Sequence, residues 1–150
     1  MSKVVDMHTH FLPESWPDLS QRFGTPNWPW MRHAGGGKAM LMLGEEEFRP
    51  VSDACWNSAV RIEEMDRSGV DIQIMCATPV LFAYTRPNGH AQEAAELFND
   101  AALEMCARNP NRLKALCQVP LQDIDASCRE VSRAKRSGHL GVQIGNHVGQ

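Results

Sequence analysis

Short runs of β-branched and other apolar residues alternate along this chain with longer amphipathic stretches. The runs predict four strands, at Val4–Met7, Asp71–Cys76, Leu113–Val119 and Gly141–Ile144. Strands that alternate with helices form βαβ units, in which the strands are parallel and the crossovers are right-handed. The pattern therefore predicts an α/β protein that is built on a parallel sheet.

Three stretches between these strands have the 3.6-residue periodicity of amphipathic helices. We expect them at about residues 57–69, 89–108 and 123–138. Asn57 can cap the first of them, and either Asp123 or Asp125 can cap the third, because these side chains accept hydrogen bonds from unpaired N–H groups. In the first helix, Ala59, Ile62 and Met65 are expected to face the core.

The segment between the first strand and the first helix, residues 11–56, is much longer than the usual βα loop of about two to six residues. We interpret it as a cap insertion within a single partial barrel domain that spans residues 1–150. Its Trp- and Pro-rich front part, residues 16–30, predicts an irregular packed cover, whereas residues 39–43 and 48–51 predict a small hairpin. Loops that follow the strands of a βα barrel lie at the catalytic face, so the insertion is expected to roof the site.

The composition limits the classes of partner. A net charge of -3 provides no basic field for nucleic acid, and no apolar run approaches the roughly 20 residues that span a bilayer. Asp6 interrupts the first apolar stretch, which argues against a signal peptide, so we expect a cytoplasmic protein without nucleic-acid or membrane partners. The 5 cysteines lack Cys-x-x-Cys spacing, which argues against a disulfide framework and against a thiolate zinc site.

The first strand ends in a pair of histidines that are suited to metal binding. Side chains alternate along a strand, so His8 and His10 project to the same side while Thr9 points away. A catalytic zinc site uses three protein ligands and leaves one position open, so this pair would supply two ligands and at least one more is required. A His-x-His pair can also be a polar strand end, but its position at the mouth of a barrel favours metal ligation.

Arg49 is the candidate substrate-binding residue of the insertion. Its planar guanidinium lies between Phe48 and Pro50 and is suited to hold a carboxylate through two parallel hydrogen bonds. A surface ion pair with one of the glutamates at 45–47 is an equally good explanation. The candidate pocket-lining residues are Phe48, Phe82, Tyr84 and His147. Packing is the alternative role of the aromatic residues, and an ordinary loop hydrogen bond is the alternative role of the histidine.

Several blocks of the sequence resemble one known family. They are Asp6–Phe11, Phe48–Val51, Arg61–Asp66, Ala77–Val80, Gln118–Asp123 and Gly138–His147. Over essentially the whole chain, and in the same order, these blocks resemble the 2-amino-3-carboxymuconate-6-semialdehyde decarboxylase family of the amidohydrolase superfamily. The His-x-His pair alone would indicate only the superfamily.

The resemblance implies the N-terminal half of a (β/α)8 TIM barrel with a long insertion after the first strand. It implies a zinc-dependent, non-hydrolytic decarboxylase of 2-amino-3-carboxymuconate 6-semialdehyde, in tryptophan or nitrobenzoate-type catabolism. His8 and His10 would bind Zn2+ or another divalent transition metal, and Arg49 would bind the carboxylate of the small-molecule substrate. A full-length protein of this family would be a homodimer.

The chain departs from the family because four βα units make only half of an eightfold barrel. In the family, a third histidine ligand, an aspartate ligand and the catalytic histidine lie beyond the point that corresponds to residue 150. We therefore expect no catalytic residue within the chain, which would be an inactive N-terminal portion or a half-barrel that pairs with a second half. The alternatives are another metal-dependent hydrolase or aromatic-acid decarboxylase of the superfamily, and a non-catalytic half-barrel assembly module.

Overall fold

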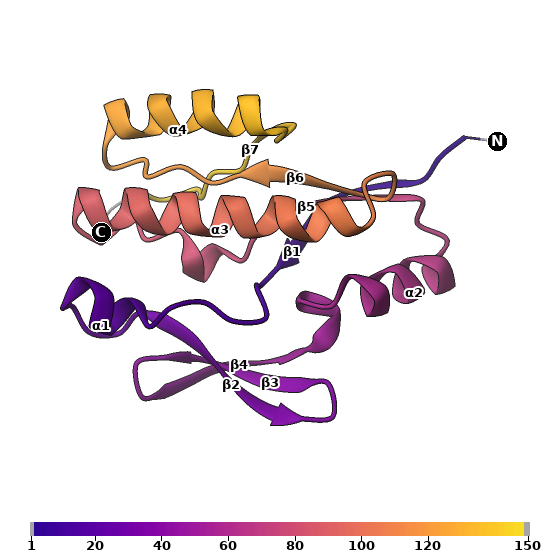
Figure 1. Ribbon diagram of the computed structural model, residues 1–150, viewed down its shortest axis with the longest axis horizontal. Helices are drawn as coiled ribbons and strands as arrows, with labels where there is room; N and C mark the ends of the chain where they lie inside the picture. Colours follow the sequence, from indigo (N-terminus) through magenta and orange to yellow (C-terminus); the bar gives the residue numbers. More distant parts are fainter. Residues whose placement is uncertain (1, 149–150) are drawn as a thin grey trace.

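A four-stranded parallel sheet forms the centre of the molecule. The structure is a computed structural model that describes residues 2–148 (Figure 1). The strands are β1 (Val5–Phe11), β5 (Ile72–Ala77), β6 (Leu113–Cys117) and β7 (Gly141–Val142). They pair in the order β1-β5-β6-β7, and every pair is parallel. This is the predicted N-terminal half of a (β/α)8 barrel, although the last two strands end two residues earlier than the sequence pattern suggested.

Three helices connect these strands, and two of them begin and end at capping residues. They are α2 (Ser58–Ser68), α3 (Asn88–Arg108) and α4 (Ile124–Ser137). The Asn57 side chain accepts hydrogen bonds from the first turn of α2, and Asp123, rather than Asp125, does the same for α4. Gly69 and Gly138 end α2 and α4 with left-handed backbone angles that glycine adopts without strain. None of the helices described between residues 2 and 148 is long and apolar enough to cross a membrane.

The insertion after β1 is more regular than its sequence predicted. It contains helix α1 (Leu19–Phe23) and an antiparallel sheet of β2 (Pro29–Gly35), β3 (Lys38–Leu43) and β4 (Glu46–Ser52), followed by the 3-10 turn η1 (Asp53–Cys55). The predicted hairpin of β3 and β4 is confirmed. The prediction of an irregular cover for residues 16–30 is wrong, because Asp18 caps α1 and β2 pairs with β3. Most of β2 is exposed, so no alternation of buried residues marked it as a strand.

Helix α3 joins the insertion to the barrel sheet in one hydrophobic core. Buried residues of both sheets pack around it, among them Phe11 and Met75 from the barrel, Leu41 from the insertion and Phe98 from the helix itself. The Trp16 ring meets the Phe98 ring edge to face, with 5.6 Å between centroids. In Figure 1, the three-stranded sheet lies on the opposite side of α3 from α4. The insertion is therefore a packed part of the fold.

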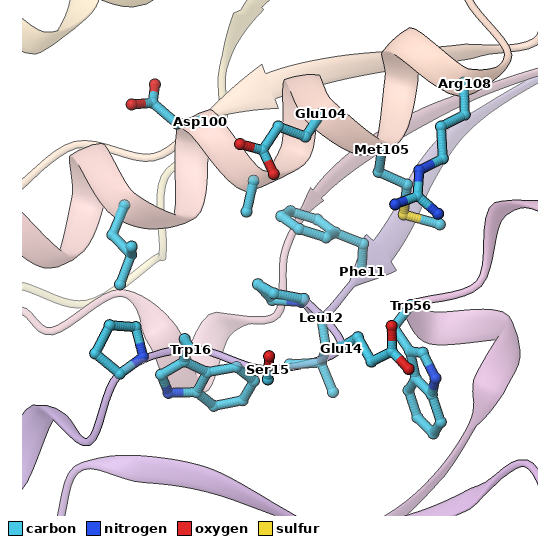
Figure 2. Close-up of a pocket in the computed structure, with 14 residues that line it drawn as sticks. Phe11, Leu12, Glu14, Ser15, Trp16, Trp56, Asp100, Glu104, Met105 and Arg108 are labelled. Atoms are coloured by element: carbon cyan, nitrogen blue, oxygen red, sulfur yellow. The ribbon is translucent and has the colours of Figure 1, made fainter.

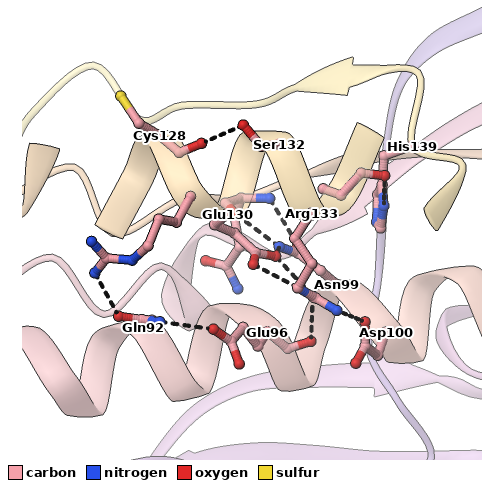
Figure 3. A network of polar contacts seen from close by, with 12 residues as sticks. Gln92, Glu96, Asn99, Asp100, Cys128, Glu130, Ser132, Arg133 and His139 are labelled. Carbon is pink, nitrogen blue, oxygen red and sulfur yellow. Dashed lines mark hydrogen bonds and ion pairs between the residues drawn. The ribbon is translucent and has the colours of Figure 1, made fainter. Parts of the chain in front are cut away.

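A buried polar network fixes α4 against α3 and β6 (Figure 3). Glu130 is 2% exposed and accepts hydrogen bonds from Arg133 Nε at 2.7 Å and from Asn99 Nδ2 at 2.6 Å. The Asn99 side chain also donates to the carbonyl of Gln118 at 2.9 Å and accepts from its N–H at 2.8 Å. The network satisfies polar groups that would be costly to bury without partners.

Candidate metal centre

His8 and His10 lie together at the carboxyl end of β1. Their imidazole rings meet edge to face, at an interplanar angle of 83° and with 4.9 Å between centroids. His8 is exposed and His10 is half-buried. Two imidazoles that bind one zinc ion through nitrogen at about 2 Å have ring centres roughly 5 Å apart, so the pair fits a shared ion. The predicted convergence of the rings is present, and their role as ligands stays a prediction.

The pairing of β1 with β5 is irregular at His8. Asp6 lies opposite Gln73 in β5, whereas Thr9 lies opposite Met75, so β1 has one more residue than β5 between these two positions. The N–H of His8 donates a hydrogen bond to the carboxylate of Asp6, two residues earlier, at Oδ1 and 3.2 Å. Such bulges redirect side chains and occur frequently beside active sites.

The surroundings of His10 favour its neutral form. Burial lowers the pKa of His10, and the neighbouring His8 ring lowers it further. Hydrogen bonds to the backbone of Ala77 and Cys76 oppose this shift, and the charge of Arg49 adds to it. Neutral imidazole is the form that binds a metal. The Cys76 sulfur lies 3.5 Å from His10 Nδ1, and burial raises the pKa of this thiol to about 11, so it remains protonated.

Arg49 and His10 line the same pocket, which has a volume of about 570 Å³. Arg49 and Phe48 come from β4 of the insertion, His10 comes from β1, and Thr78 belongs to the loop after β5. The Arg49 guanidinium carbon lies 5.8 Å from the centroid of the Phe48 ring. The alternative of an ion pair is not seen: none of the ion pairs between residues 2 and 148 includes Arg49, and Glu47 pairs with Arg32.

The other predicted pocket residues lie elsewhere. Phe82 is 5% exposed and belongs to the core, and its ring centroid is 5.5 Å from that of Tyr84. The Tyr84 hydroxyl accepts a hydrogen bond from the N–H of Gly145 at 3.1 Å, which ties the loop after β5 to the segment after β7. His147 is exposed beyond β7. Of the four predicted lining residues, only Phe48 is in the pocket of His10 and Arg49, as far as the described residues show.

The donor set that this part of the chain offers is incomplete. Within residues 2–148, no three His, Cys, Asp or Glu side chains are grouped closely enough to hold a metal ion. A catalytic zinc site takes three protein ligands, so His8 and His10 would supply two of them.

Arg61 of α2, which donates a hydrogen bond to the backbone carbonyl of His10 at 2.7 Å, was not predicted from the sequence as a residue of the site. Arg61 is buried, and so are Ser58 and Met65, which places the buried stripe of α2 at residues 58, 61 and 65. The expectation that Ala59 faces the core is wrong, because its side chain is exposed. The spacing of four residues between Arg61 and the buried Met65 was the signal that could have identified this arginine.

A second pocket, of about 450 Å³, lies between the β1–α1 segment and α3 (Figure 2). Glu104 and Arg108 of α3 form one side of it, and Trp16 and Trp56 form the other. It contains neither of the two histidines nor Arg49. The predicted chemistry is therefore assigned to the pocket of His10 and Arg49.

Comparison with known proteins agrees with the fold and with the resemblance seen in the sequence. The chain is 35% identical, over 98% of its length, to the 2-amino-3-carboxymuconate-6-semialdehyde decarboxylase of Dictyostelium discoideum. It is 28% identical, over 99% of its length, to the protein of the same name from Caenorhabditis elegans. It spans 41% and 42% of the length of these two relatives. No family model matches the chain.

Solved structures of decarboxylases share the fold. A 2,6-dihydroxybenzoate decarboxylase in complex with 2,6-dihydroxybenzoate superposes with a TM-score of 0.65 at 23% identity, over 99% of this chain and 40% of that chain. A 5-carboxyvanillate decarboxylase from Novosphingobium aromaticivorans, with bound manganese, has a TM-score of 0.59 at 28% identity, over 64% of this chain and 28% of that chain. The fold is thus the N-terminal half of a (β/α)8 barrel, shared with these decarboxylases. Within that class, the resemblance to the 2-amino-3-carboxymuconate-6-semialdehyde decarboxylases is confirmed.

Proposed function

We propose that this chain supplies part of the active site of a metal-dependent, non-oxidative decarboxylase, and that the substrate is 2-amino-3-carboxymuconate 6-semialdehyde. The observation that carries this proposal is the shared pocket of His10 and Arg49, which brings a metal-ligand candidate and a carboxylate-binding candidate together from two different sheets. The similarity of nearly the whole chain to decarboxylases of that name supports the choice of substrate.

His8 and His10 would hold the divalent ion, with further ligands from outside this chain. Zn2+ is the ion we propose, and Mn2+ is the alternative because it is bound in a structural neighbour. When bound, such an ion acts as a Lewis acid and stabilises negative charge that develops on a substrate oxygen. The residues of this chain do the positioning: β1 presents the two rings, and the buried Cys76 thiol lies against the side of the His10 ring that faces β5.

Arg49 would bind a substrate carboxylate and set its orientation. Its guanidinium has no carboxylate partner among the ion pairs of residues 2–148, so its donors are available to a ligand. The planar fork matches both oxygens of a carboxylate, which fixes the plane of the substrate as well as neutralising its charge. Leu41, Val51 and Val80 give the same pocket apolar walls beside the exposed Arg49.

We further propose that residues 1–150 form one partial barrel domain with residues 11–56 as its cap. The chain spans 41% of its Dictyostelium relative, which supports the proposal that the missing ligands and the general acid lie outside this chain. A cytoplasmic homodimer is the proposed state of the full-length protein.

The decisive experiment measures CO2 release by the protein at its natural full length, loaded with Zn2+ or Mn2+. We expect turnover of 2-amino-3-carboxymuconate 6-semialdehyde. The matched control substrate is 2,6-dihydroxybenzoate, which is also called gamma-resorcylate. It is chosen because a gamma-resorcylate decarboxylase from Rhizobium radiobacter is 34% identical over 56% of this chain. Turnover of the dihydroxybenzoate alone would favour the second candidate, an aromatic-acid decarboxylase. Failure to release CO2 from either acid would contradict the proposal.

A further inference from the structure

Arg61 is a buried cation without a carboxylate partner. Its side chain projects from α2 toward the barrel sheet and is 7% exposed. None of the ion pairs found between residues 2 and 148 includes it. Burying a charge that has no oppositely charged partner is costly unless hydrogen bonds satisfy it. The hydrogen bonds that this guanidinium makes must therefore offset a large cost.

Those hydrogen bonds go to the first two strands of the barrel, beside the metal-ligand candidates. Arg61 Nη2 donates to the backbone carbonyl of His10 at 2.7 Å. Arg61 Nη1 donates to Thr9 Oγ1 at 3.0 Å and to Gln73 Oε1 at 3.0 Å. Thr9 lies between the two histidines and points to the opposite face of β1. The guanidinium thus holds β1 from behind, at the point from which the two rings project forward.

A second branch of this network leads to His8. Gln73 Nε2 donates to Asp6 Oδ2 at 3.3 Å, and Asp6 Oδ1 accepts the N–H of His8 at 3.2 Å. The pairing of β1 with β5 shifts between Asp6 and Thr9, so regular ladder bonds do not fix the backbone at His8. The side chains of Gln73 and Asp6 take over that task, and Arg61 anchors them.

We propose that Arg61 is a positioning residue for the His8–His10 metal site, holding His10 directly and His8 through Gln73 and Asp6. This inference rests on the proposed function, since it requires that the two histidines bind a metal. Partners that orient ligands from behind a metal site typically change metal affinity by about 10- to 100-fold when they are removed. The hydrogen bonds of Arg61 go to the His10 carbonyl and to the side chains of Thr9 and Gln73, so its effect is transmitted through β1.

A purely structural role for Arg61, as a link between α2 and the sheet, predicts a different result. Arg112 provides the matched control, because it also joins α2 to the sheet. It donates to the carbonyls of Asp71 at 2.6 Å and Val70 at 3.0 Å and pairs with Asp66 at 2.7 Å. These contacts lie at the beginning of β5, at the far end of the strand from His10, whose partner is Cys76. Loss of Arg112 should therefore weaken the fold without moving the histidines.

The test uses the protein at its natural full length, with Arg61→Met, Arg61→Lys and Arg112→Met variants. The dissociation constant of Zn2+ is measured by competition with a chelator, and the visible spectrum of the Co2+-loaded protein reports the coordination geometry. Urea unfolding of the metal-free protein measures stability. We expect Arg61→Met to weaken Zn2+ binding by about 10- to 100-fold and to shift the Co2+ bands, whereas Arg112→Met changes only stability. Arg61→Lys should be intermediate, because a single ammonium cannot reach all three acceptors.

Zn2+ affinity and Co2+ bands in Arg61→Met that match those of Arg112→Met would overturn the positioning role while leaving the metal site in place. A wild-type protein that binds Zn2+ no better than a His10→Ala variant would overturn both the metal site and this inference. If Arg61→Met does not fold, Gln73→Met decides the question by the same readouts. Gln73→Met removes the hydrogen bonds that lead to His8 and keeps the bond from Arg61 to the His10 carbonyl. If the Zn2+ affinity and the Co2+ spectrum are unchanged both in Gln73→Met and in Arg61→Lys, the proposal is overturned.

Discussion

The rings of His8 and His10 stand 4.9 Å apart, edge to face, on one side of β1. If both bind one ion, His8→Ala and His10→Ala should each lose the metal and the activity together, since neither ring alone retains the ion. Metal content after gel filtration checks this. His33→Ala, which removes an exposed histidine from β2, is the control and should retain the metal. Full zinc content in a double variant that carries both His8→Ala and His10→Ala would rule out this site.

Arg49 should contribute to catalysis without affecting the metal. We expect Arg49→Ala to lower kcat/KM by at least about a hundredfold, because a charge-assisted pair with the substrate is lost in a pocket with apolar walls. Arg49→Lys should fail as well, since an ammonium lacks the planar fork. Steady-state kinetics with metal analysis measure both effects. Arg32→Ala removes a matched arginine from the neighbouring part of the same sheet, and it should behave like wild type.

Glu130 should be among the most sensitive positions for stability. Glu130→Ala removes a 2% exposed carboxylate and takes one hydrogen-bond partner from each of Arg133 and Asn99, which should cost about 3–5 kcal/mol of unfolding free energy. Urea unfolding measures the loss. Asp100→Ala removes the other, largely exposed partner of Arg133 and should cost less than about 1 kcal/mol. Equal effects of the two substitutions would show that burial of Glu130 does not decide its contribution.

His139 should make stability depend on pH. Its side chain is 6% exposed, and burial lowers its pKa from the ordinary 6.5, while a hydrogen bond to the backbone of Ala134 opposes the shift. As pH falls, the unfolded chain therefore takes up a proton on His139 before the folded chain does. The stabilisation from neutral, buried His139 is complete above about pH 6.5 and is lost as pH falls through the lower pKa of the folded state. Urea midpoints should decrease between about pH 7.5 and 5, and less steeply in His139→Gln. The exposed His147→Gln is the control.

Within residues 2–148, the barrel sheet has an unpaired edge at β1 and another at β7. Met7 on β1 is 63% exposed, and Ile144, just after β7, is 59% exposed. Unpaired edges with apolar side chains favour association, so residues 1–150 expressed alone should self-associate and should not release CO2. Light scattering over a concentration series measures the association, and the double variant Met7→Lys and Ile144→Lys should reduce it. Ile124→Lys, on α4, is the control at 76% exposure. A monomer at all concentrations would contradict this expectation.

The elements that depend on local sequence information were predicted correctly. The strand and helix periodicities located β1, β5, β6 and β7 and the three helices between them, and Asn57 and Gly138 marked helix ends through their own side-chain and backbone chemistry. The side-by-side placement of His8 and His10 also followed from the sequence, because alternation along a strand depends only on the covalent geometry of the chain.

Which of the candidate residues lie together depends on how the helices and sheets pack in three dimensions. Arg49 and His10 share a pocket because α3 packs the insertion against the barrel, and no spacing along the chain encodes that contact. Strand β2 forms because β3 offers it an edge, although its own side chains are mostly exposed. Arg61 is charged, as most surface residues are. It is buried because folding brings hydrogen-bond acceptors from β1 and β5 to its guanidinium. Contacts between distant segments arise when whole helices and strands pack together, so the sequence pattern of a single element does not predict them.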